Sequence, residues 1–434
     1  MNQSVLIDID QLRVGMFIQL DLGWMNHPFP MSSFRVSSQE QIHTLRELGL
    51  KQVRYVPAKS QPVPEVPARS GLQRDGAETA VPDPAGAFGT QEQSLDTSAS
   101  FSGTRAWREQ SESLQRCGQR YREATDTYVM VSTQVLVSPP DARRQVDALV
   151  GSCVAELLDA EHCAIRLLAE VPSERPALHA VNVMVLALLL GRALGLQSRE
   201  LHHVGVAALL HDLGKIMLPP HVGEPGASLT PADLSRYEGH VGHSVELGQR
   251  MELASDVLIA IAQHHEMADG SGFPLRLMAD DLGRGGQIVA LANRYDRLCN
   301  PLHGAQALTP HEALSQIFAQ QKMCFDATVL GAFIRMMGVY PPGSLVQLTD
   351  GRFALVVSVD ALHPLRPCVL PFDAKVPRSQ AVAMDLAAYP DEGIRRSLKP
   401  EQLPREALDY LSPQQRICYF FERAVDARRC EDGA

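Results

Sequence analysis

The stretch VGVAALLHDLGKI, residues 204–216, decides how the chain is interpreted. Its first seven residues are apolar or glycine, and they predict a buried helix that ends in His211 and Asp212. An imidazole beside a carboxylate in a water-poor setting is costly unless a hydrogen bond or a metal ion satisfies both groups. A lone His-Asp pair is more often a buried hydrogen-bonded pair than a metal site, so other parts of the sequence must decide between the two.

A second histidine pair lies in AIAQHHEMADGSGFP, residues 260–274. His264 and His265 end an apolar predicted helix, and neighbours on a helix point about 100° apart, so both reach one ion only where the chain bends. Such a pair is ordinarily a surface feature. Here a loop follows whose glycines and proline specify a backbone shape that could pack against a ligand, and its candidate residues are Asp269, Gly270, Gly272, Phe273 and Pro274.

Two further histidines extend the set, although each alone is more often structural. His179 opens the apolar segment LHAVNVMVLALLL, and His240 ends LTPADLSRYEGH. Together these side chains offer five imidazoles and one carboxylate, enough for two divalent ions that share Asp212. The proposed ligands are His179, His211, Asp212, His240, His264 and His265, and Lys215 lies one turn beyond His211.

Composition limits the class of protein. The chain has 434 residues, long enough for two or three domains, and its net charge of -10 argues against binding to DNA or other polyanions. The apolar run near residues 180–191 is shorter than the ~20 residues of a membrane span, and the N-terminus has no basic region of a secretory signal. The eight scattered cysteines suit neither zinc nor disulfides. We expect a cytoplasmic protein.

The sequence predicts a mainly α protein with a modular order. Residues 1–57 are a small α+β domain, and residues 58–103 are a disordered linker rich in Pro, Ser, Gly and Ala. Residues 104–338 carry apolar residues at helical spacing and are expected to form an all-helical domain. Residues 339–434 are expected to form a small β-rich extension.

Individual segments are assigned from the same periodicities. Helical spacing is found at residues 37–50, 105–131, 141–170, 181–196 and 405–429. Strand-like runs occur at residues 5–9, 16–22, 51–56, 344–350, 351–360 and 366–374. An Asp350-Gly351 turn joins the run at 344–350 to the run at 351–360.

On these residues, the sequence resembles the HD-GYP family, a branch of the HD phosphohydrolase superfamily that hydrolyses the bacterial second messenger cyclic di-GMP. The matching stretches are His179, HDLGK at 211–215, LTPADLSRYEGH at 229–240 and HHEMADGSGFP at 264–274, in the family order. The resemblance covers about residues 150–340 and implies an HD-type helical fold for them. Residues 1–57 resemble the small DUF3391 domain often found ahead of such modules.

The resemblance implies a metal-dependent phosphodiesterase in bacterial signal transduction that converts cyclic di-GMP to pGpG or GMP. It implies two divalent ions, iron or manganese, on the six ligands above together with Asn293. Asp212 and Lys215 are the implied catalytic residues, and residues 269–274 form the substrate loop. The protein partners that we consider are a diguanylate cyclase or another signalling protein, and a second copy of the chain. For the last of these the alternatives stay open, because residues 104–137 could pair between protomers or pack on their own domain.

The chain departs from the family pattern at four places. Asn293, in ANRYDRL, stands where the family has a ligand Asp, and Asp296 one turn later either compensates or caps the helix. Arg175 replaces a Glu that binds a third ion in some members, Phe273 replaces the GYP tyrosine, and CNPLH at 299–303 replaces an Arg-Pro-Tyr-like segment. Two alternatives therefore stay open: a catalytically weak or inactive receptor or adaptor, and an HD phosphohydrolase for another nucleotide.

Overall fold

A computed structural model of the protein describes residues 4–20, 33–36, 39–47, 50–57, 60, 97–168, 173–223, 230–301 and 307–423. The chain divides near residues 105 and 106 into two units, which are described separately. Most of the predicted linker, residues 61–96, lies outside the described residues. Its predicted end is wrong, because helix α2 (Thr97–Gln134) already begins at Thr97 rather than near residue 104.

The N-terminal unit is a four-stranded antiparallel sheet with one helix. The strands follow the order β1-β4-β2-β3, and Ile18, Ile42 and Val53 are buried between sheet and helix. Every element except β3 lies in a segment where the sequence predicts it. The elements are β1 (Val5–Asp8), β2 (Phe17–Gln19), β3 (Ser33–Arg35), α1 (Gln39–Glu47) and β4 (Gln52–Tyr55).

The second unit is built around α4 (Arg175–Ala193), which is buried from Ala177 to Gly191. Among the described residues, α4 is the one helix long and apolar enough to cross a membrane, but 83% of its apolar window is buried inside the unit, as a core helix requires. The other helices are α3 (Pro139–Asp159), α5 (Ser198–Leu210), α6 (Pro220–Gly223), α7 (Pro231–Glu238), α8 (His240–Arg250), α9 (Ser255–Gln263), α10 (Arg284–Cys299), α11 (Pro310–Gln320) and α12 (Ala327–Met337).

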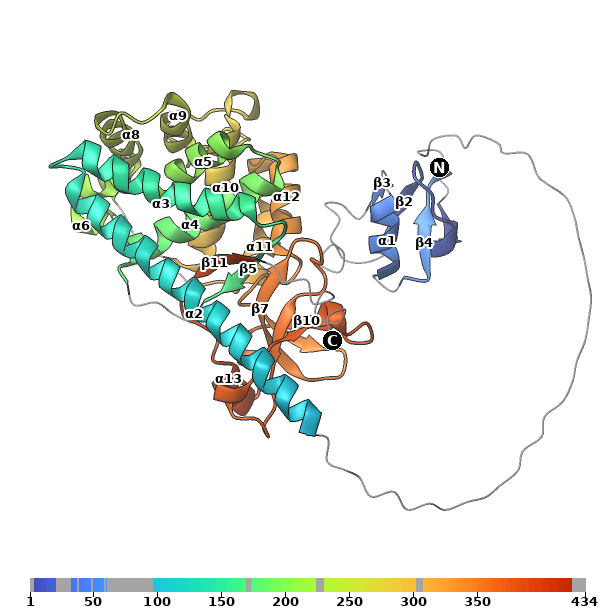
Figure 1. The fold of residues 1–434 in the computed structure, drawn as a ribbon. Helices are drawn as coiled ribbons and strands as arrows, with labels where there is room; N and C mark the ends of the chain where they lie inside the picture. Colours follow the sequence, from blue (N-terminus) through green and yellow to red (C-terminus); the bar gives the residue numbers. More distant parts are fainter. Residues whose placement is uncertain are drawn as a thin grey trace, which may run out of the picture. The chain divides into compact units, whose positions relative to one another are not determined.

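A seven-stranded sheet lies beside these helices, and α2 runs along both (Figure 1). The main path of the seven-stranded sheet is β10-β6-β7-β5-β11, with β8 paired to β7 and β9 paired to β8. The three predicted C-terminal strands are present, as is the turn at Gly351. The strands are β5 (Cys163–Leu167), β6 (Leu345–Leu348), β7 (Phe353–Asp360), β8 (Cys368–Pro371), β9 (Met384–Asp385), β10 (Ile394–Leu398) and β11 (Tyr419–Arg423).

The mainly α class is confirmed, but two segments predicted as helix are strands. Residues 163–167 form β5, which pairs with both β7 and β11. In the described part of the predicted helix at 405–429, residues 405–423, only α13 (Arg405–Leu411) is helical, and β11 follows it. Ala164, Ile165 and Leu167 of β5 and Tyr419, Phe420 and Phe421 of β11 are buried, and such short apolar stretches do not distinguish a buried strand from a buried helix. Residues 339–423 share one core with the helices and do not form a separate appendage.

Candidate metal centre

The candidate ligands are brought together at the ends of four helices. His179 lies in the first turns of α4, His211 follows the last residue of α5, and Asp212 precedes the short 3-10 helix η4 (Leu213–Met217). His240 begins α8, and His264 and His265 follow the last residue of α9. The helices pack in the core, while the N-terminal ends of α4 and α8 and the C-terminal ends of α5 and α9 form one buried polar cluster.

Close packing of η4 against α8 fixes the position of Asp212. Gly214 donates its backbone N–H to the hydroxyl of Ser244 on α8 over 2.8 Å. A methyl group on Gly214 would overlap the carbonyl oxygen of His240 and the backbone nitrogen of Ser244. The glycine of HDLGK is therefore required by the close approach of two backbones.

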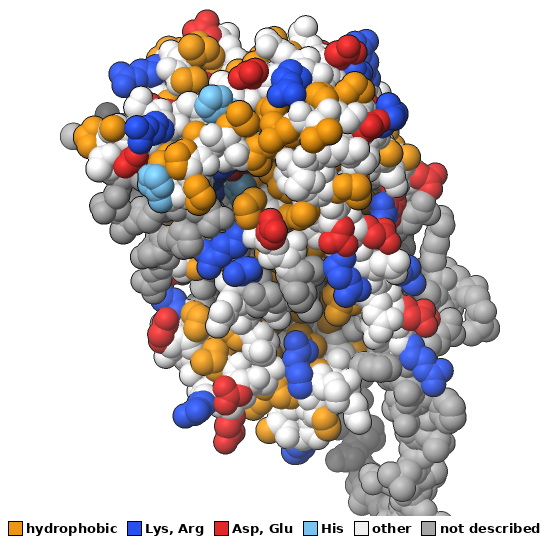
Figure 2. All heavy atoms as spheres, turned by 90° about the vertical axis from the view of Figure 1, so that its left-hand side faces the viewer, with side chains coloured by type: hydrophobic (Ala, Val, Ile, Leu, Met, Phe, Trp, Pro, Cys, Tyr) orange, Lys and Arg blue, Asp and Glu red, His pale blue; other side chains and the backbone are white. Residues whose placement is uncertain are grey.

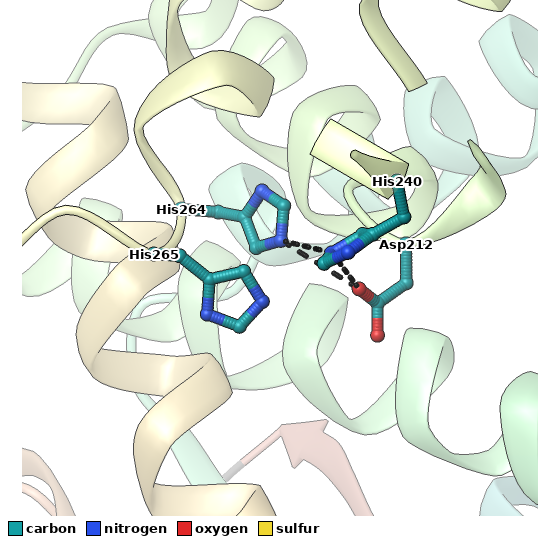
Figure 3. A group of neighbouring side chains, drawn as sticks. All are labelled: Asp212, His240, His264 and His265. Carbon is teal, nitrogen blue, oxygen red and sulfur yellow. Dashed lines mark hydrogen bonds and ion pairs between the residues drawn. The ribbon is translucent and has the colours of Figure 1, made fainter. Parts of the chain in front are cut away.

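The two carboxylate oxygens of Asp212 face two different groups of histidines. Oδ1 lies 3.2 Å from Nε2 of His240 and 3.6 Å from Nε2 of His264, and Figure 3 shows both rings directed at this oxygen. His265 completes this group, which we call the Oδ1 position. Oδ2 lies 3.4 Å from Nε2 of His211 and 3.5 Å from Nε2 of His179, and these form the Oδ2 position.

Hydrogen bonds at Nδ1 set the tautomers of four histidines. His211 donates to the Ala208 carbonyl over 2.7 Å, and His264 donates to the Ile261 carbonyl over 2.6 Å. His240 donates in the same way to Tyr237, and His179 donates to the Asp296 carboxylate over 2.6 Å. Each Nε2 therefore presents a lone pair to the centre, as in a histidine that ligates a metal.

Burial keeps His211, His240, His264 and His265 in the neutral form that binds metals, because it lowers the pKa of each. It lowers the pKa of His240 and of His264 to about 4, and it holds the pKa of His265 well below its ordinary value. Burial alone would raise the pKa of Asp212, but Lys215, His211 and Arg297 hold it well below its ordinary value. The centre thus combines neutral nitrogen donors with one carboxylate.

Two buried atoms indicate that a cation fits the Oδ1 position. Within the described part of the chain, Oδ1 of Asp212 and Nε2 of His265 have no hydrogen-bond partner. Both are lone-pair donors, and the neighbouring Nε2 atoms of His240 and His264, 3.3 Å apart, are lone-pair donors as well. A divalent ion satisfies all of these atoms together, whereas an empty cluster would leave them unpaired.

Two cationic side chains contact the other carboxylate oxygen. Lys215 Nζ and Arg297 Nη2 each lie 2.6 Å from Oδ2 of Asp212. The sequence pointed to Lys215, but Arg297 was missed. The signal was present, because Arg297 follows Asn293 by four residues and so shares its face of α10.

The structure gives Asn293 and Asp296 partners that the sequence did not predict. The side-chain oxygen of Asn293 accepts from Arg297 Nε over 2.9 Å, and its amide nitrogen donates to the His264 carbonyl over 3.4 Å. Asp296 is fully buried and neither caps α10 nor replaces Asn293 as a ligand in these groups. It orients His179 and accepts a second hydrogen bond from Asn182.

The predicted substrate loop packs directly against His265. The Phe273 ring stacks on the His265 ring, with the ring centroids 4.3 Å apart. Gly272 leaves no space for a side chain against the backbone of Glu266 and His265. Asp269 binds Ser271 within the loop and belongs to neither ligand group.

Glu266 was missed in the sequence although it follows the histidine pair directly. Its side chain is 1% exposed, and its two carboxyl oxygens accept the backbone N–H groups of Leu275 (2.6 Å) and Leu277 (2.9 Å). These bonds tie the far end of the loop, beyond Pro274, to the end of α9.

Comparisons with known proteins match two parts of the chain. A family model for the HD domain matches residues 162–329, and one for a domain of unknown function, DUF3391, matches residues 4–145. The second match runs past residue 57, the predicted end of the N-terminal domain, into α3.

A cyclic di-GMP phosphodiesterase of Pseudomonas aeruginosa is 28% identical over 384 residues, 87% of each chain. A 3'3'-cGAMP-specific phosphodiesterase of Vibrio cholerae is 28% identical over 162 residues, 36% of this chain and 30% of that protein. A solved structure of an HDG"Y"P protein from Bdellovibrio bacteriovorus aligns with a TM-score of 0.41 and 16% identity over 76% of this chain and 98% of that one.

Proposed function

We propose that this chain, which matches an HD-domain model and a DUF3391 model ahead of it, is an HD-domain protein of the HD-GYP type and hydrolyses the phosphodiester bonds of cyclic di-GMP. The observation that carries the proposal is the pair of ligand groups sharing Asp212, one on each carboxylate oxygen. The Pseudomonas relative, whose name states this activity, matches over most of both chains.

The residues present fit a cluster of divalent ions, which we propose to be two ions of iron or manganese. Bound ions would supply a nucleophile at neutral pH and charge to hold the phosphate oxygens. Asp212 would join the two positions. The neutral histidines would hold ions without adding positive charge, so the net charge at the centre would stay favourable for a dianionic substrate.

Lys215 is the residue of the chain that we assign to the phosphate. Its ammonium lies 5.2 Å from the centre of the Tyr237 ring, and it also contacts Asp212. As a compact point charge on a flexible stem it could turn from Asp212 to a phosphate oxygen. The loop at Asp269, Gly270, Gly272, Phe273 and Pro274 would bound the substrate on the His265 side.

The overall step is hydrolysis at phosphorus. Water adds to the phosphorus, the bond to the ribose 3'-oxygen breaks, and the leaving oxygen takes a proton. One such event opens the ring to linear pGpG, and a second gives GMP. We expect the reaction in the cytoplasm. Figure 2 shows basic and acidic side chains interspersed over one face of the molecule. A diguanylate cyclase is one protein partner that would supply the substrate.

The test is turnover by purified protein reloaded with Mn²⁺ or Fe²⁺. Cyclic di-GMP and 3'3'-cGAMP are incubated in parallel, and products are separated by chromatography. We expect pGpG or GMP from cyclic di-GMP, and no product from the His211→Ala variant, which should also lose the ion at the Oδ2 position. Lys215→Gln should lower kcat more than it changes KM. Preferential cleavage of 3'3'-cGAMP would assign the enzyme to another cyclic dinucleotide.

A receptor without catalytic activity is the second candidate. The observation that favours it is the contact of Arg297 with Asp212, because a guanidinium on the shared carboxylate opposes the binding of an ion there. Binding of cyclic di-GMP by the metal-loaded protein, measured by calorimetry, without any product would establish this role and exclude the first.

A further inference from the structure

We propose that Arg297 makes the two ion positions unequal: the Oδ1 position holds its ion tightly, and the Oδ2 position takes its ion only in competition with the Arg297 guanidinium. The inference deepens the proposed function, on which it rests for the presence of ions. It concerns a positioning residue that the sequence did not single out.

The hydrogen bonds of Asp212 divide between its two oxygens in an unequal way. Oδ1 has no donor among the described residues, so its lone pairs are available to an ion. Oδ2 accepts from Lys215 and from Arg297, each over 2.6 Å. Because a carboxylate oxygen has about two lone-pair directions, an ion at Oδ2 must displace at least one of these donors.

Arg297 is the harder of the two donors to displace. Its side chain is 17% exposed, and a second nitrogen, Nε, is held by the Asn293 oxygen over 2.9 Å. The planar guanidinium is fixed at two points and keeps its charge at every accessible pH. Lys215 is held at Asp212 by one bond and can rotate about its stem.

Asn293 strengthens the competition because it is neutral. It accepts a hydrogen bond from Arg297 but offers no negative charge, so the ion pair that the structure gives Arg297 is with Asp212. A carboxylate at position 293 would share the guanidinium and weaken its hold on Oδ2. The neutral residue at 293 and the cation at 297 therefore act in the same direction.

The test counts ions rather than product. Apo protein is titrated with Mn²⁺, bound metal per chain is measured by mass spectrometry after dialysis, and spin-coupled ion pairs are detected by electron paramagnetic resonance. We expect wild type to retain one ion and to show the coupled signal only at a Mn²⁺ concentration at least 10-fold higher. Arg297→Met should bring the two affinities together and give the coupled signal at the lower concentration.

Matched variants test whether Arg297 causes the difference in affinity between the two ion positions. Arg294→Met removes a neighbouring arginine of α10 whose Nε binds Gln321, and it should behave as wild type. His240→Ala should remove the tight ion, and His179→Ala only the weak one. Circular dichroism melting of each variant separates lost binding from lost folding, and Arg297→Lys, which keeps charge but not the fork, should give an intermediate result.

Equal affinity of the two positions in wild type would overturn the inference, as would an unchanged difference in Arg297→Met or loss of the tight ion in His179→Ala. Absence of any bound metal would overturn the inference together with the metal-dependent function. Two ions bound with equal affinity, together with turnover, would refute only the inference. Two ions bound with unequal affinity, without turnover, would refute only the proposed activity.

Discussion

The carboxylate of Asp296 accepts the Nδ1 hydrogen of His179 over 2.6 Å, and Nε2 of the same ring lies 3.2 Å from Nε2 of His211. Asp296 is held in turn by Asn182 and Asn300, which each donate to its other oxygen. This chain of bonds fixes the orientation of a histidine at the Oδ2 position before any ion arrives. Such outer partners of ligating histidines change metal affinity by about 10 to 100-fold.

Replacing Asp296 by Asn should therefore weaken the Oδ2 position. The asparagine is neutral, and it cannot offer an acceptor to both His179 and its two asparagine neighbours, so one set of bonds is lost. We expect about 10-fold weaker binding of the second Mn²⁺, measured by titration, with the first ion unaffected. Asn300→Ala serves as control, because it removes a donor to the same carboxylate without touching His179. Equal loss in both variants would mean that packing, not orientation, is affected.

Gly214→Ala should disrupt the centre through backbone contact alone. The added methyl overlaps the backbone of His240 and Ser244, and overpacking costs about 1–3 kcal/mol. We expect a lower melting temperature and reduced metal retention. Gly242→Ala on the same helix α8 meets nothing within 4 Å and should be neutral or stabilising by roughly 0.5–1 kcal/mol. A Gly214→Ala variant as stable as Gly242→Ala would contradict the close approach.

Glu266→Gln should loosen the loop beyond Pro274. A glutamine offers one acceptor and one donor to two backbone N–H groups, so the amide of Leu275 or Leu277 loses its partner, at a cost of about 1–3 kcal/mol. We expect faster hydrogen exchange at these two amides, measured by mass spectrometry. Glu246→Gln, at an exposed position on α8, should leave exchange unchanged. Unaltered exchange at Leu275 and Leu277 would show that other contacts hold the loop.

The sequence predicted the α class and which histidines lie together around Asp212, because those signals are local; that these side chains bind metal stays a prediction. A polar residue at the end of an apolar helix is visible in the printed sequence, as at His211 and His264. Strands β5 and β11 could not be recognised, because their pairing joins residues more than 250 apart, as in Leu167 and Tyr419, and their buried faces have no alternation.

Arg297 and Glu266 show a second limit of sequence reasoning. Both have long charged side chains, which are ordinarily solvated, so each was passed over. Their roles depend on which atoms lie opposite: Asp212 for Arg297, and two backbone amides for Glu266. Such partners are fixed by the packing of α10 and of the loop, not by spacing in the chain.

The free energy of unfolding should decrease as the pH is lowered, because of a buried histidine remote from the centre. His311, at the start of α11, is 6% exposed, donates Nδ1 to the Val339 carbonyl over 2.8 Å and stacks on Tyr340. Burial lowers its pKa from 6.5, despite opposing effects of Val339 and Glu312. Below about pH 6.5 the unfolded chain binds a proton that the folded chain does not, so acidification favours unfolding.

His311→Gln should remove this contribution. The glutamine does not titrate, so the difference in unfolding free energy between pH 7 and pH 5 should be smaller than in wild type. Urea midpoints at both pH values measure it, with the same metal loading throughout so that the histidines of the centre contribute equally. His363→Gln, at a half-exposed surface position, should keep the wild-type difference. If His311→Gln also keeps the wild-type difference in unfolding free energy between the two pH values, the proton uptake on unfolding must come from other groups. The burial of His311 then cannot be its source.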